Sequence, residues 1–438
     1  MKNDARFVAY KILKRFNAKN RKVSLIINEV FNSCSYDEIL KSRSTVLVND
    51  IIRLQGRLDL MIKFISGKNI KQINQKCLLI LRIGFYELVI DKQVPDYAAV
   101  NSAVELAKNV LNLKSVGFVN AILRKLSSKK CNLKYLKSIK NKHQWYSLPL
   151  WLQKRWIKNF GQKDFTQLAR IVNKIPTNFL RIDSKKYSAD ILKKELNTLG
   201  IKSEKFLPNF LEIQSGLSKV FETNLFNNGQ ISIQNPASAA IVDILNVKNG
   251  DTVLDVCAAP GTKSLYLANI VGNEGKVLAS DISPDRVKQG EKDFFRHHKN
   301  NIEWYVKDAS KDKFPAANRI LIDAPCSGTG VIARKPDIRW LRKPSDINRM
   351  AKLQYEILDN CAHYLNPNGV IIYSTCSIEP EENWNVVEKF LKMNDNFILD
   401  KINSKIPKSW IDRKGTLKTL PHIHGVDGMF AAKLKRLN

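Results

Sequence analysis

The stretch Arg319-Ile-Leu-Ile-Asp323-Ala-Pro-Cys326-Ser-Gly-Thr-Gly330 joins an apolar run to an abrupt polar end. Such a run predicts a buried parallel strand whose last residues lie at the carboxyl edge of a sheet. Open α/β sheets bind ligands at that edge. The pattern recurs about fifty residues later in Gly369-Val-Ile-Ile-Tyr373-Ser-Thr-Cys376-Ser377. We therefore expect two strands to present one cysteine each to a common crevice.

Regular alternation of strand and helix patterns surrounds these two stretches and predicts a doubly wound parallel sheet. A long amphipathic helix is expected at 347–365, between the two cysteine-bearing strands. The other strands are expected at 252–256, 276–280, 302–306 and 428–434. The fold class is therefore α/β for this part of the chain.

Small residues dominate the loop after the first of these strands, Cys257-Ala258-Ala259-Pro260-Gly261-Thr262-Lys263. Backbone N–H groups in such a turn can approach a ligand closely. The loop lacks the Gly-x-Gly-x-x-Gly spacing of dinucleotide folds and the Gly-Lys-Ser/Thr ending of phosphate-binding loops. Hydride transfer and nucleotide hydrolysis are therefore disfavoured. An adenosyl cofactor without phosphates, S-adenosylmethionine, fits better, because its positive sulfonium suits a crevice of small residues and acids.

Aspartates stand at the ends of three successive predicted strands, at Asp255, Asp281 and Asp308. The position of Asp281 is one where an acid can bind both ribose hydroxyls of an adenosyl cofactor. Asp308 is expected to contact the adenine amino group. Aspartate also favours caps and turns, so each of these residues taken alone is as readily a turn former. Three in succession favour a cofactor site.

The seven cysteines have no disulfide-like spacing, which predicts free thiols in a reducing cytosol. A cysteine is most often a small buried apolar residue, so we assign Cys77 and Cys361 to helix cores. No role is expected for Cys34 and Cys131. Cys257 is expected to line the cofactor loop with its backbone.

Cys326 and Cys376 differ from the other cysteines because each follows a strand among small polar residues. A thiol there is exposed to a crevice and can become a thiolate. Both are candidate catalytic residues. Their positions alone do not say which of the two attacks.

The formal net charge of the 438-residue chain is +31. Residues 1–150 hold 28 Lys and Arg against 10 Asp and Glu, a surplus of +18. Such a surplus implies a polyanionic partner, most readily nucleic acid. The alternative is compositional drift with solvated lysines. Apolar runs near eighteen residues and a signal-peptide pattern are missing, so we expect a cytoplasmic protein without a membrane segment.

Three domains are expected along the chain. Residues 1–140 form an all-α domain, because apolar residues recur at three- and four-residue spacing. Residues 141–233 combine a linker with a small α/β subdomain, and the lysine-rich linker pattern begins at Cys131. In this part, helices are expected at 151–159, 164–173 and 189–199, and strands at 178–182 and 210–213. Residues 234–438 form the catalytic domain. The helices of the first domain are expected at 5–16, 23–31, 43–65, 75–90, 97–111 and 117–126.

Several motifs resemble those of known families. RNA cytosine 5-methyltransferases have motifs similar to Asp255-Val-Cys-Ala-Ala-Pro-Gly261-Thr-Lys263, Asp323-Ala-Pro-Cys326-Ser-Gly-Thr-Gly330 and Tyr373-Ser-Thr-Cys376-Ser-Ile-Glu-Pro-Glu-Glu-Asn383. Segments 96–107 and 117–124 resemble the RNA-binding helical domain of the antitermination factor NusB. With Pro336-Asp-Ile-Arg-Trp340, almost the whole chain resembles the bacterial small-subunit ribosomal RNA methyltransferase B family. Thr262 and Asn235 depart from that family, which usually has a second glycine and an aspartate there.

This resemblance implies a Rossmann-like class I S-adenosylmethionine-dependent methyltransferase sheet that follows a NusB-like domain. It implies methylation of carbon 5 of a cytosine in 16S ribosomal RNA. A thiolate that adds to carbon 6 makes carbon 5 nucleophilic enough to take the methyl group. The resemblance assigns that attack to Cys376 and the release of the methylated base to Cys326. Asp323 would hydrogen-bond or protonate the ring edge and border the cofactor.

Small-subunit ribosomal RNA is the implied partner, and we expect a monomer without a metal. Because the target base must leave its stack, the basic loop 334–340 is expected to bind phosphates around the extruded nucleotide. A solvated surface turn is the alternative for that loop. Two alternative functions remain. One is the same reaction on transfer RNA or another RNA, and the other is a non-catalytic RNA-binding assembly factor.

Overall fold

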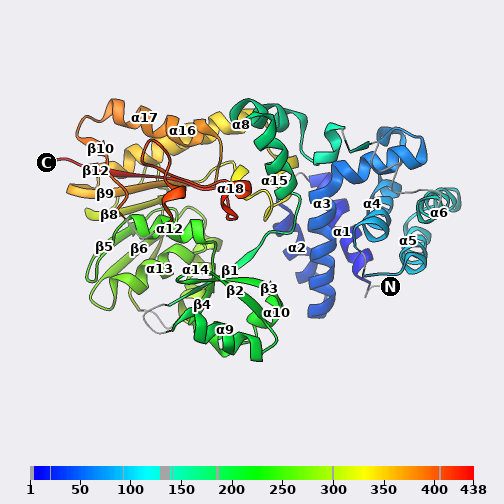
Figure 1. Cartoon of the computed structure of the whole chain (residues 1–438), viewed down its shortest axis with the longest axis horizontal. Helices are drawn as coiled ribbons and strands as arrows, with labels where there is room; N and C mark the ends of the chain where they lie inside the picture. Colours follow the sequence, from blue (N-terminus) through cyan, green and yellow to red (C-terminus); the bar gives the residue numbers. More distant parts are fainter. Residues whose placement is uncertain are drawn as a thin grey trace. The chain divides into compact units, whose positions relative to one another are not determined.

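A computed structural model describes residues 4–19, 21–91, 93–128, 139–140, 142–183, 187–297, 300–403 and 406–438 (Figure 1). The chain divides into two compact units. The helical unit comprises Met1–Ile175 and Ile332–Arg342, and the sheet unit comprises Pro176–Val331 and Lys343–Asn438. Cys131 and most of the expected linker, 131–138 and 141, lie outside the described residues. The division into three domains stays a prediction.

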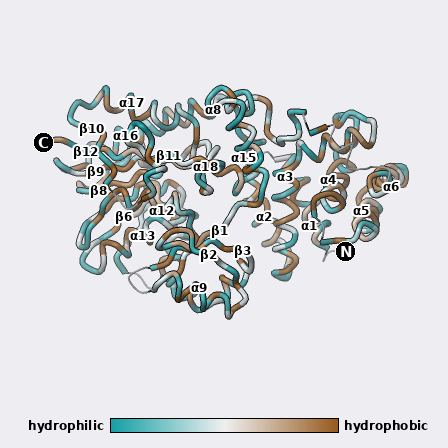
Figure 2. The backbone as a smooth tube through the Cα atoms, viewed as in Figure 1, coloured by the Kyte–Doolittle hydropathy of each residue, from teal (hydrophilic) through white to brown (hydrophobic). Residues whose placement is uncertain are grey.

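The helices predicted for the first part of the chain are confirmed, with ends that differ by a few residues. Their apolar faces form one core that includes Leu47, Ile51 and Phe85. Hydrophobic and hydrophilic segments alternate along these helices, as amphipathic helices require (Figure 2). The helices are α1 (Ala5–Lys19), α2 (Val23–Asn32), α3 (Glu38–Ser66), η1 (Ile70–Gln72), α4 (Gln75–Val89), α5 (Asp96–Val110), α6 (Leu113–Ser127) and η2 (His143–Tyr146).

Helix α8 (Leu150–Ile171) corresponds to two helices in the sequence-based prediction, at 151–159 and 164–173. The break between those two falls at Gly161, which has non-helical dihedrals inside α8. Its φ of +81° lies in the region that side chains with a Cβ rarely adopt. The kink therefore depends on glycine at this position.

The segment 332–342, which contains α15 (Ile338–Leu341), belongs to the helical unit. Arg339 is fully buried there. Its guanidinium donates hydrogen bonds to the carbonyl oxygens of Arg53 at 2.6 Å, Ser147 at 3.1 Å and Val172 at 2.9 Å. A fourth goes to Asn173 Oδ1 at 2.6 Å. Burial, reinforced by the charge of Arg53, lowers the pKa of Arg339 to about 9.

The expectation that the loop 334–340 binds phosphates through its basic side chains is therefore wrong for Arg339. A guanidinium that is fully buried and hydrogen-bonded to interior oxygen atoms cannot reach an RNA phosphate. Trp340 likewise donates its indole N–H to the carbonyl of Ile52, at 2.8 Å. Lys335 is the exposed basic residue of the segment.

A small antiparallel sheet opens the sheet unit, with strand order β2-β3-β1-β4. The predicted strands β1 and β3 and the helix α9 are confirmed. Strands β2 and β4 were not predicted, because β2 is largely polar and β4 has three residues. The elements are β1 (Asn178–Ile182), α9 (Ala189–Thr198), β2 (Lys202–Leu207), β3 (Phe210–Ser215), α10 (Leu217–Val220), α11 (Asn224–Asn227) and β4 (Ile231–Ile233).

The main sheet has the order β10-β12-β9-β8-β5-β6-β7, and β11 pairs with β12. β5 to β9 pair in parallel and β12 joins β9 antiparallel, so the predicted doubly wound sheet is confirmed. Chain order reverses between β5 and β8, which makes their carboxyl ends the switch point where such sheets bind ligands. The strands are β5 (Thr252–Asp255), β6 (Lys276–Asp281), β7 (Ile302–Val306), β8 (Ala317–Asp323), β9 (Leu365–Thr375), β10 (Phe397–Leu399), β11 (Leu417–Lys418) and β12 (Phe430–Arg436).

Helices cover the two faces of this sheet. Alternate strand residues point to opposite faces, and Val253 and Leu254 accordingly belong to different apolar clusters. One cluster includes α12 (Pro236–Ile244) and α13 (Thr262–Val271), and the other includes α16 (Pro344–Ala362) and α17 (Trp384–Met393). Helix α16 begins and ends about three residues before its predicted range, because β9 already starts at Leu365. Among the described residues, no helix combines the length and apolarity needed to cross a membrane.

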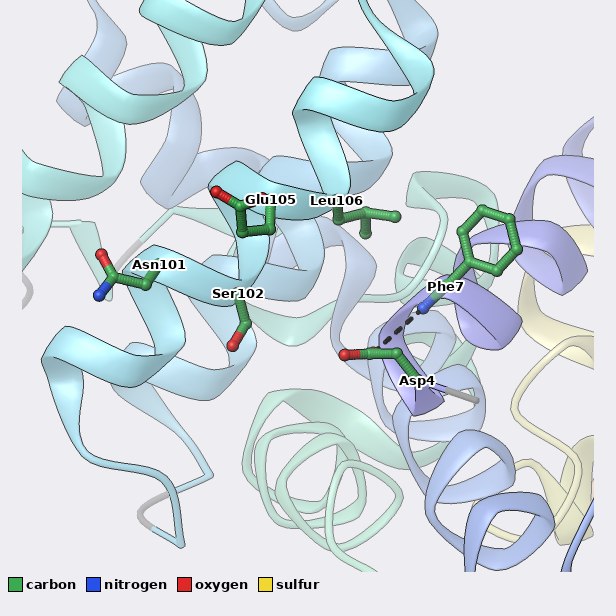
Figure 3. A pocket seen from close by; sticks show the side chains of 6 residues that line it. All are labelled: Asp4, Phe7, Asn101, Ser102, Glu105 and Leu106. Carbon is green, nitrogen blue, oxygen red and sulfur yellow. Dashed lines mark hydrogen bonds between the residues drawn. The ribbon is translucent and has the colours of Figure 1, made fainter. Parts of the chain in front are cut away.

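A pocket of about 250 Å³ lies in the helical unit (Figure 3). Asp4 and Glu105 contribute carboxylates to it, and Asp4 accepts a hydrogen bond from the backbone N–H of Phe7 at 3.4 Å. The lining consists of Asp4, Phe7, Asn101, Ser102, Glu105 and Leu106. Two acids without a basic side chain do not favour an RNA phosphate, and no predicted site residue lies here.

Arg339→Ala should destabilise the helical unit by at least about 3 kcal/mol, because it removes the buried guanidinium that bonds to three carbonyl groups and one amide oxygen. Thermal unfolding followed by circular dichroism would measure this as a lower midpoint. Lys335→Ala is the matched control in the same segment and should change stability by less than about 0.5 kcal/mol. An Arg339→Ala variant as stable as the parent would show that the guanidinium does not hold this segment in place.

Candidate active site

The two cysteines predicted to share a crevice lie side by side in the sheet unit, with 3.1 Å between Cys326 Sγ and Cys376 Sγ. Strands β8 and β9 pair in parallel, with Asp323 opposite Ser374. The loops that leave these strands therefore start at the same edge of the sheet. Each thiol is partly buried, and either one can donate the hydrogen bond between them.

A close backbone contact fixes the loop after each cysteine. Gly330 N–H donates to the carbonyl of Cys376 at 3.0 Å, and Gly428 N–H donates to the carbonyl of Gly330 at 3.0 Å. A Cβ on Gly330 would lie 2.0 Å from the Gly428 carbonyl oxygen. The final glycine of the Cys326 motif is therefore required by this approach, and its role was not predicted.

Lys263 ends the predicted cofactor loop, and its side chain reaches Asp323. Lys263 Nζ donates to Asp323 Oδ2 at 2.6 Å, and Ser374 Oγ donates to Asp323 Oδ1 at 3.2 Å. Burial alone would lower the pKa of Lys263, but the charge and hydrogen bond of Asp323, helped by Asp255 and Cys376, outweigh it and raise the pKa. A stable ammonium group therefore lies within electrostatic range of both the carboxylate and the Cys376 thiol.

Gly261 gives the cofactor loop its shape. Its φ is +105°, and a Cβ there would lie 2.9 Å from the Trp304 ring. Thr262, which follows, is the first residue of helix α13. A helical position accepts threonine, so this departure from the family pattern leaves the local conformation intact. The loop and the nearby acids suit an adenosyl cofactor with a positive sulfonium.

Asp255 ends β5 and is fully buried. Ser264 Oγ donates to its Oδ2 at 2.7 Å, whereas Oδ1 has no hydrogen-bond partner within the part of the chain that the structure describes. Burial raises the pKa of Asp255 to about 7, although the Ser264 hydrogen bond and the Lys263 charge oppose that rise. Asp255 therefore anchors the start of α13 to the end of β5.

Asp281 ends β6 and Asp308 follows β7, at the same edge of the sheet as Asp255. Asp281 is almost fully buried and forms an ion pair with Arg286 at 3.0 Å, and Arg286 also donates to the carbonyl of Ala259 in the cofactor loop. Asp308 instead accepts from Ser310 Oγ at 2.6 Å and Ser310 N–H at 3.0 Å. The Ser310 hydrogen bond is the main cause of the lowered pKa of Asp308. Its contact with adenine stays a prediction.

The remaining cysteines are placed as the sequence suggests where the structure describes them. Cys77 and Cys361 are buried, and burial raises the pKa of Cys361 to about 12. Cys34 is exposed. Burial, followed by neighbouring charges, raises the pKa of the Cys257 thiol, so it stays protonated at neutral pH. Within the described ranges, no group of three or more acidic, cysteine or histidine side chains could hold a metal ion.

Comparison with known proteins identifies the family. Residues 242–435 match the family model of the 16S rRNA methyltransferase RsmB/F, and residues 3–128 match that of the NusB family. The probable ribosomal RNA small subunit methyltransferase B of Bacillus subtilis (strain 168) is 30% identical over 448 residues, covering 99% of each chain. The chain belongs to the small-subunit ribosomal RNA methyltransferase B family.

Other relatives extend this comparison. The ribosomal RNA small subunit methyltransferase B of Photorhabdus laumondii is 31% identical over 396 residues, which cover 88% of each chain. The crystal structure of PH0851 matches with a TM-score of 0.76 and 26% identity, covering 100% of this chain and 99% of the other. The protein is thus an S-adenosylmethionine-dependent ribosomal RNA methyltransferase whose sheet has the class I Rossmann-like form.

Two further residues of the methyltransferase are explained by their contacts. Asn235, where the family usually has an aspartate, caps α12 by accepting from Ala237 N–H at 3.0 Å, as an aspartate would. Glu382 was not predicted as a site residue, although it lies in the quoted Cys376 motif. It is fully buried beside both cysteine loops. The only sign in the sequence that pointed to Glu382 was the pair of glutamates, Glu381 and Glu382, that follows Pro380.

Asp281→Ala should weaken S-adenosylmethionine binding by roughly 1.5 to 3 kcal/mol, because the ribose hydroxyls lose a charged acceptor. Isothermal titration calorimetry would measure the change. Asp285→Ala, an exposed acid on the helix α14 (Pro284–Arg296) that follows, is the control and should leave the affinity unchanged. Equal affinity in parent and Asp281→Ala would show that Asp281 serves only the turn and its ion pair with Arg286.

Proposed function

We propose that the two adjacent thiols divide one methyl transfer between them. The enzyme methylates carbon 5 of a cytosine in small-subunit ribosomal RNA through a covalent cysteine adduct. Cys376 Sγ forms the bond to carbon 6, and S-adenosylmethionine supplies the methyl group to carbon 5. Once the Cys376 sulfur is bonded to carbon 6, Cys326 releases its thiol proton to solvent. As a thiolate it then accepts the proton from carbon 5 as the bond between Cys376 and carbon 6 breaks. The observation that carries this proposal is the 3.1 Å separation of the two sulfur atoms.

The electrostatics favour this division of roles. The hydrogen bond with Cys376, followed by burial, raises the pKa of Cys326. Cys326 therefore stays a thiol at neutral pH and can donate its hydrogen bond to the Cys376 sulfur. The Lys263 ammonium adds a positive charge near Cys376. Both effects stabilise a thiolate at Cys376, and the thiolate is the attacking form of a cysteine.

We propose that Asp323 binds the ring edge of the extruded cytosine. Its carboxylate is 30% exposed and held by Lys263 and Ser374, so its direction is fixed before the base arrives. A fixed acceptor or proton donor at the ring supports the charge that develops when the thiolate adds. Asp323 lies between the cofactor loop and the thiols, which also suits contact with the cofactor.

The cofactor-binding residues are proposed on the same basis. The backbone of the loop 257–263 would hold the cofactor at the switch point of the sheet, with Asp281 at the ribose and Asp308 near the adenine. Arg286 supports this set, because it joins Asp281 to Ala259. The proposed residues all lie in one compact unit of one chain.

That placement supports the further proposal that the enzyme acts as a monomer, since no second copy is needed to complete the site. We also propose a cytoplasmic location, where ribosomal RNA is found. The described cysteines form no disulfide with one another, which agrees with a reducing compartment. Partly assembled subunits and naked RNA are both compatible with the +31 charge of the chain.

Cys376→Ala should abolish both methylation and the covalent RNA adduct, because no other thiolate is positioned to add to carbon 6. Cys326→Ala should slow turnover and let a denaturant-resistant protein–RNA adduct accumulate, because the bond forms but is not released. Denaturing gel electrophoresis with radiolabelled RNA measures the adduct. An adduct trapped by Cys376→Ala and absent in Cys326→Ala would exchange the two roles, and full activity in both variants would refute the mechanism.

Loss of the protein from cells should remove 5-methylcytosine from one position of 16S ribosomal RNA and leave transfer RNA unchanged. Bisulfite sequencing of both RNA classes, with and without the protein, measures this. Complementation with the parent should restore the mark, whereas complementation with Cys376→Ala should not. A mark lost from transfer RNA alone would favour the alternative substrate, and an unchanged pattern would favour an assembly factor without catalysis.

A further inference from the structure

One buried carboxylate touches both cysteine loops. Glu382, in the short helix η4 (Pro380–Glu382), has no exposed surface. Its Oε1 accepts from Ser327 N–H at 2.7 Å. Its Oε2 accepts from Ser377 Oγ at 2.6 Å and from the hydroxyl of Ser327. Ser327 follows Cys326 and Ser377 follows Cys376, so a single side chain bonds to the residue next to each thiol.

A second set of contacts holds this carboxylate in place. Gln354 of α16 is fully buried and donates from Nε2 to Glu382 Oε1 at 3.1 Å and to the carbonyl of Pro325 at 2.9 Å. Tyr373 of β9 donates its hydroxyl to the carbonyl of Glu382 at 2.6 Å and to Gln354 Oε1 at 3.2 Å. Pro325 precedes Cys326, so the Cys326 loop is bonded on both sides of the cysteine.

The chemistry of these contacts requires an acceptor-only group. Ser327 N–H, the two serine hydroxyls and the Gln354 amide all donate to Glu382. An ionised carboxylate offers acceptor sites on both oxygens, whereas an amide of the same shape replaces one acceptor with a donor. Charge-assisted hydrogen bonds also offset the cost of burying the charge. A helix cap or a packing role would not need three donors from the two cysteine loops and a fourth from α16.

We propose that Glu382 is a positioning residue that sets the separation and direction of the Cys326 and Cys376 thiols. Glu382 has no assigned contact with substrate or cofactor and acts through Ser327 and Ser377. Small displacements of a reacting group can lower a rate by about a hundredfold. The proposal rests on the proposed division of roles between the cysteines, but the thiol geometry that it describes can be measured without RNA.

The geometric test uses diamide, which oxidises two neighbouring thiols to a disulfide and is itself reduced to the hydrazine. The parent should form the Cys326–Cys376 disulfide readily because its sulfur atoms lie 3.1 Å apart. Glu382→Gln should form it roughly tenfold more slowly, as measured by mass spectrometry of the linked peptides. Asp243→Asn is the matched carboxylate-to-amide control, since Asp243 bonds to Tyr266 at 2.6 Å and touches neither cysteine loop.

The catalytic test compares Glu382→Gln with its parent in the Cys326→Ala background, where the adduct should accumulate. The rate of adduct formation should fall roughly tenfold to a hundredfold, while S-adenosylmethionine affinity stays within about twofold. Ser377→Ala, which frees the loop of Cys376, should reduce adduct formation by itself. Ser327→Ala should instead slow release in the protein that retains both cysteines. A general loss of stability would not slow adduct formation in one variant and release in the other.

Parental rates of both disulfide and adduct formation in Glu382→Gln would overturn the proposal. So would an equal loss in Asp243→Asn, since that would indicate a stability effect. If Glu382→Gln does not fold, the proposal is tested with Ser377→Ala and Ser327→Ala instead. Identical effects of these two variants on adduct formation and on release would show that the two loops are not positioned separately, and would refute the proposal. Slower disulfide formation without any adduct in the Cys326→Ala parent would uphold the positioning role and count against the proposed function instead.

Discussion

The parallel pairing of β8 with β9, continuous from Arg319 to Asp323, is the constraint on which the candidate active site depends. It sets Asp323 beside Ser374, so the two polar strand ends leave the sheet at the same level. A shift of one residue would turn the side chains of either strand to the opposite face. The buried apolar residues on both faces hold that register, because each cluster loses contacts if the strand slips. This pairing brings the two cysteine loops to one edge of the sheet, where Cys326 Sγ and Cys376 Sγ lie 3.1 Å apart.

Buried charges at this edge are arranged so that each one has a partner of complementary character. Lys263 pairs with Asp323, and Ser264 donates to Asp255. An unpaired charge in the interior would be costly, and neutralisation by protonation is the usual result. The pKa of about 7 for Asp255 shows that burial can approach this limit even beside Lys263. Because Lys263 is paired with Asp323, its ammonium group stays near the thiols without being an unpaired buried charge.

The helical unit uses a different solution for a buried charge. In the described part of the chain, the hydrogen-bond partners of Arg339 include no carboxylate, and it donates instead to three backbone carbonyls and one amide oxygen. These acceptors come from α3, the turn after η2, and the end of α8. One guanidinium therefore ties together segments that are far apart in the sequence. The residue therefore contributes to the fold of this unit.

The sequence by itself determined three features: the doubly wound parallel sheet, the helices of the first part of the chain, and the sheet edge at which Asp323, Cys326 and Cys376 meet. These features depend on local periodicity and on polar residues that end apolar strands, and both are visible along the chain. Only the tertiary structure decided the partner of Lys263, the burial of Arg339 and the contacts of Glu382 with both cysteine loops. The physical reason is that a charged side chain is buried or exposed according to donors and acceptors supplied by distant segments, which local sequence patterns do not specify.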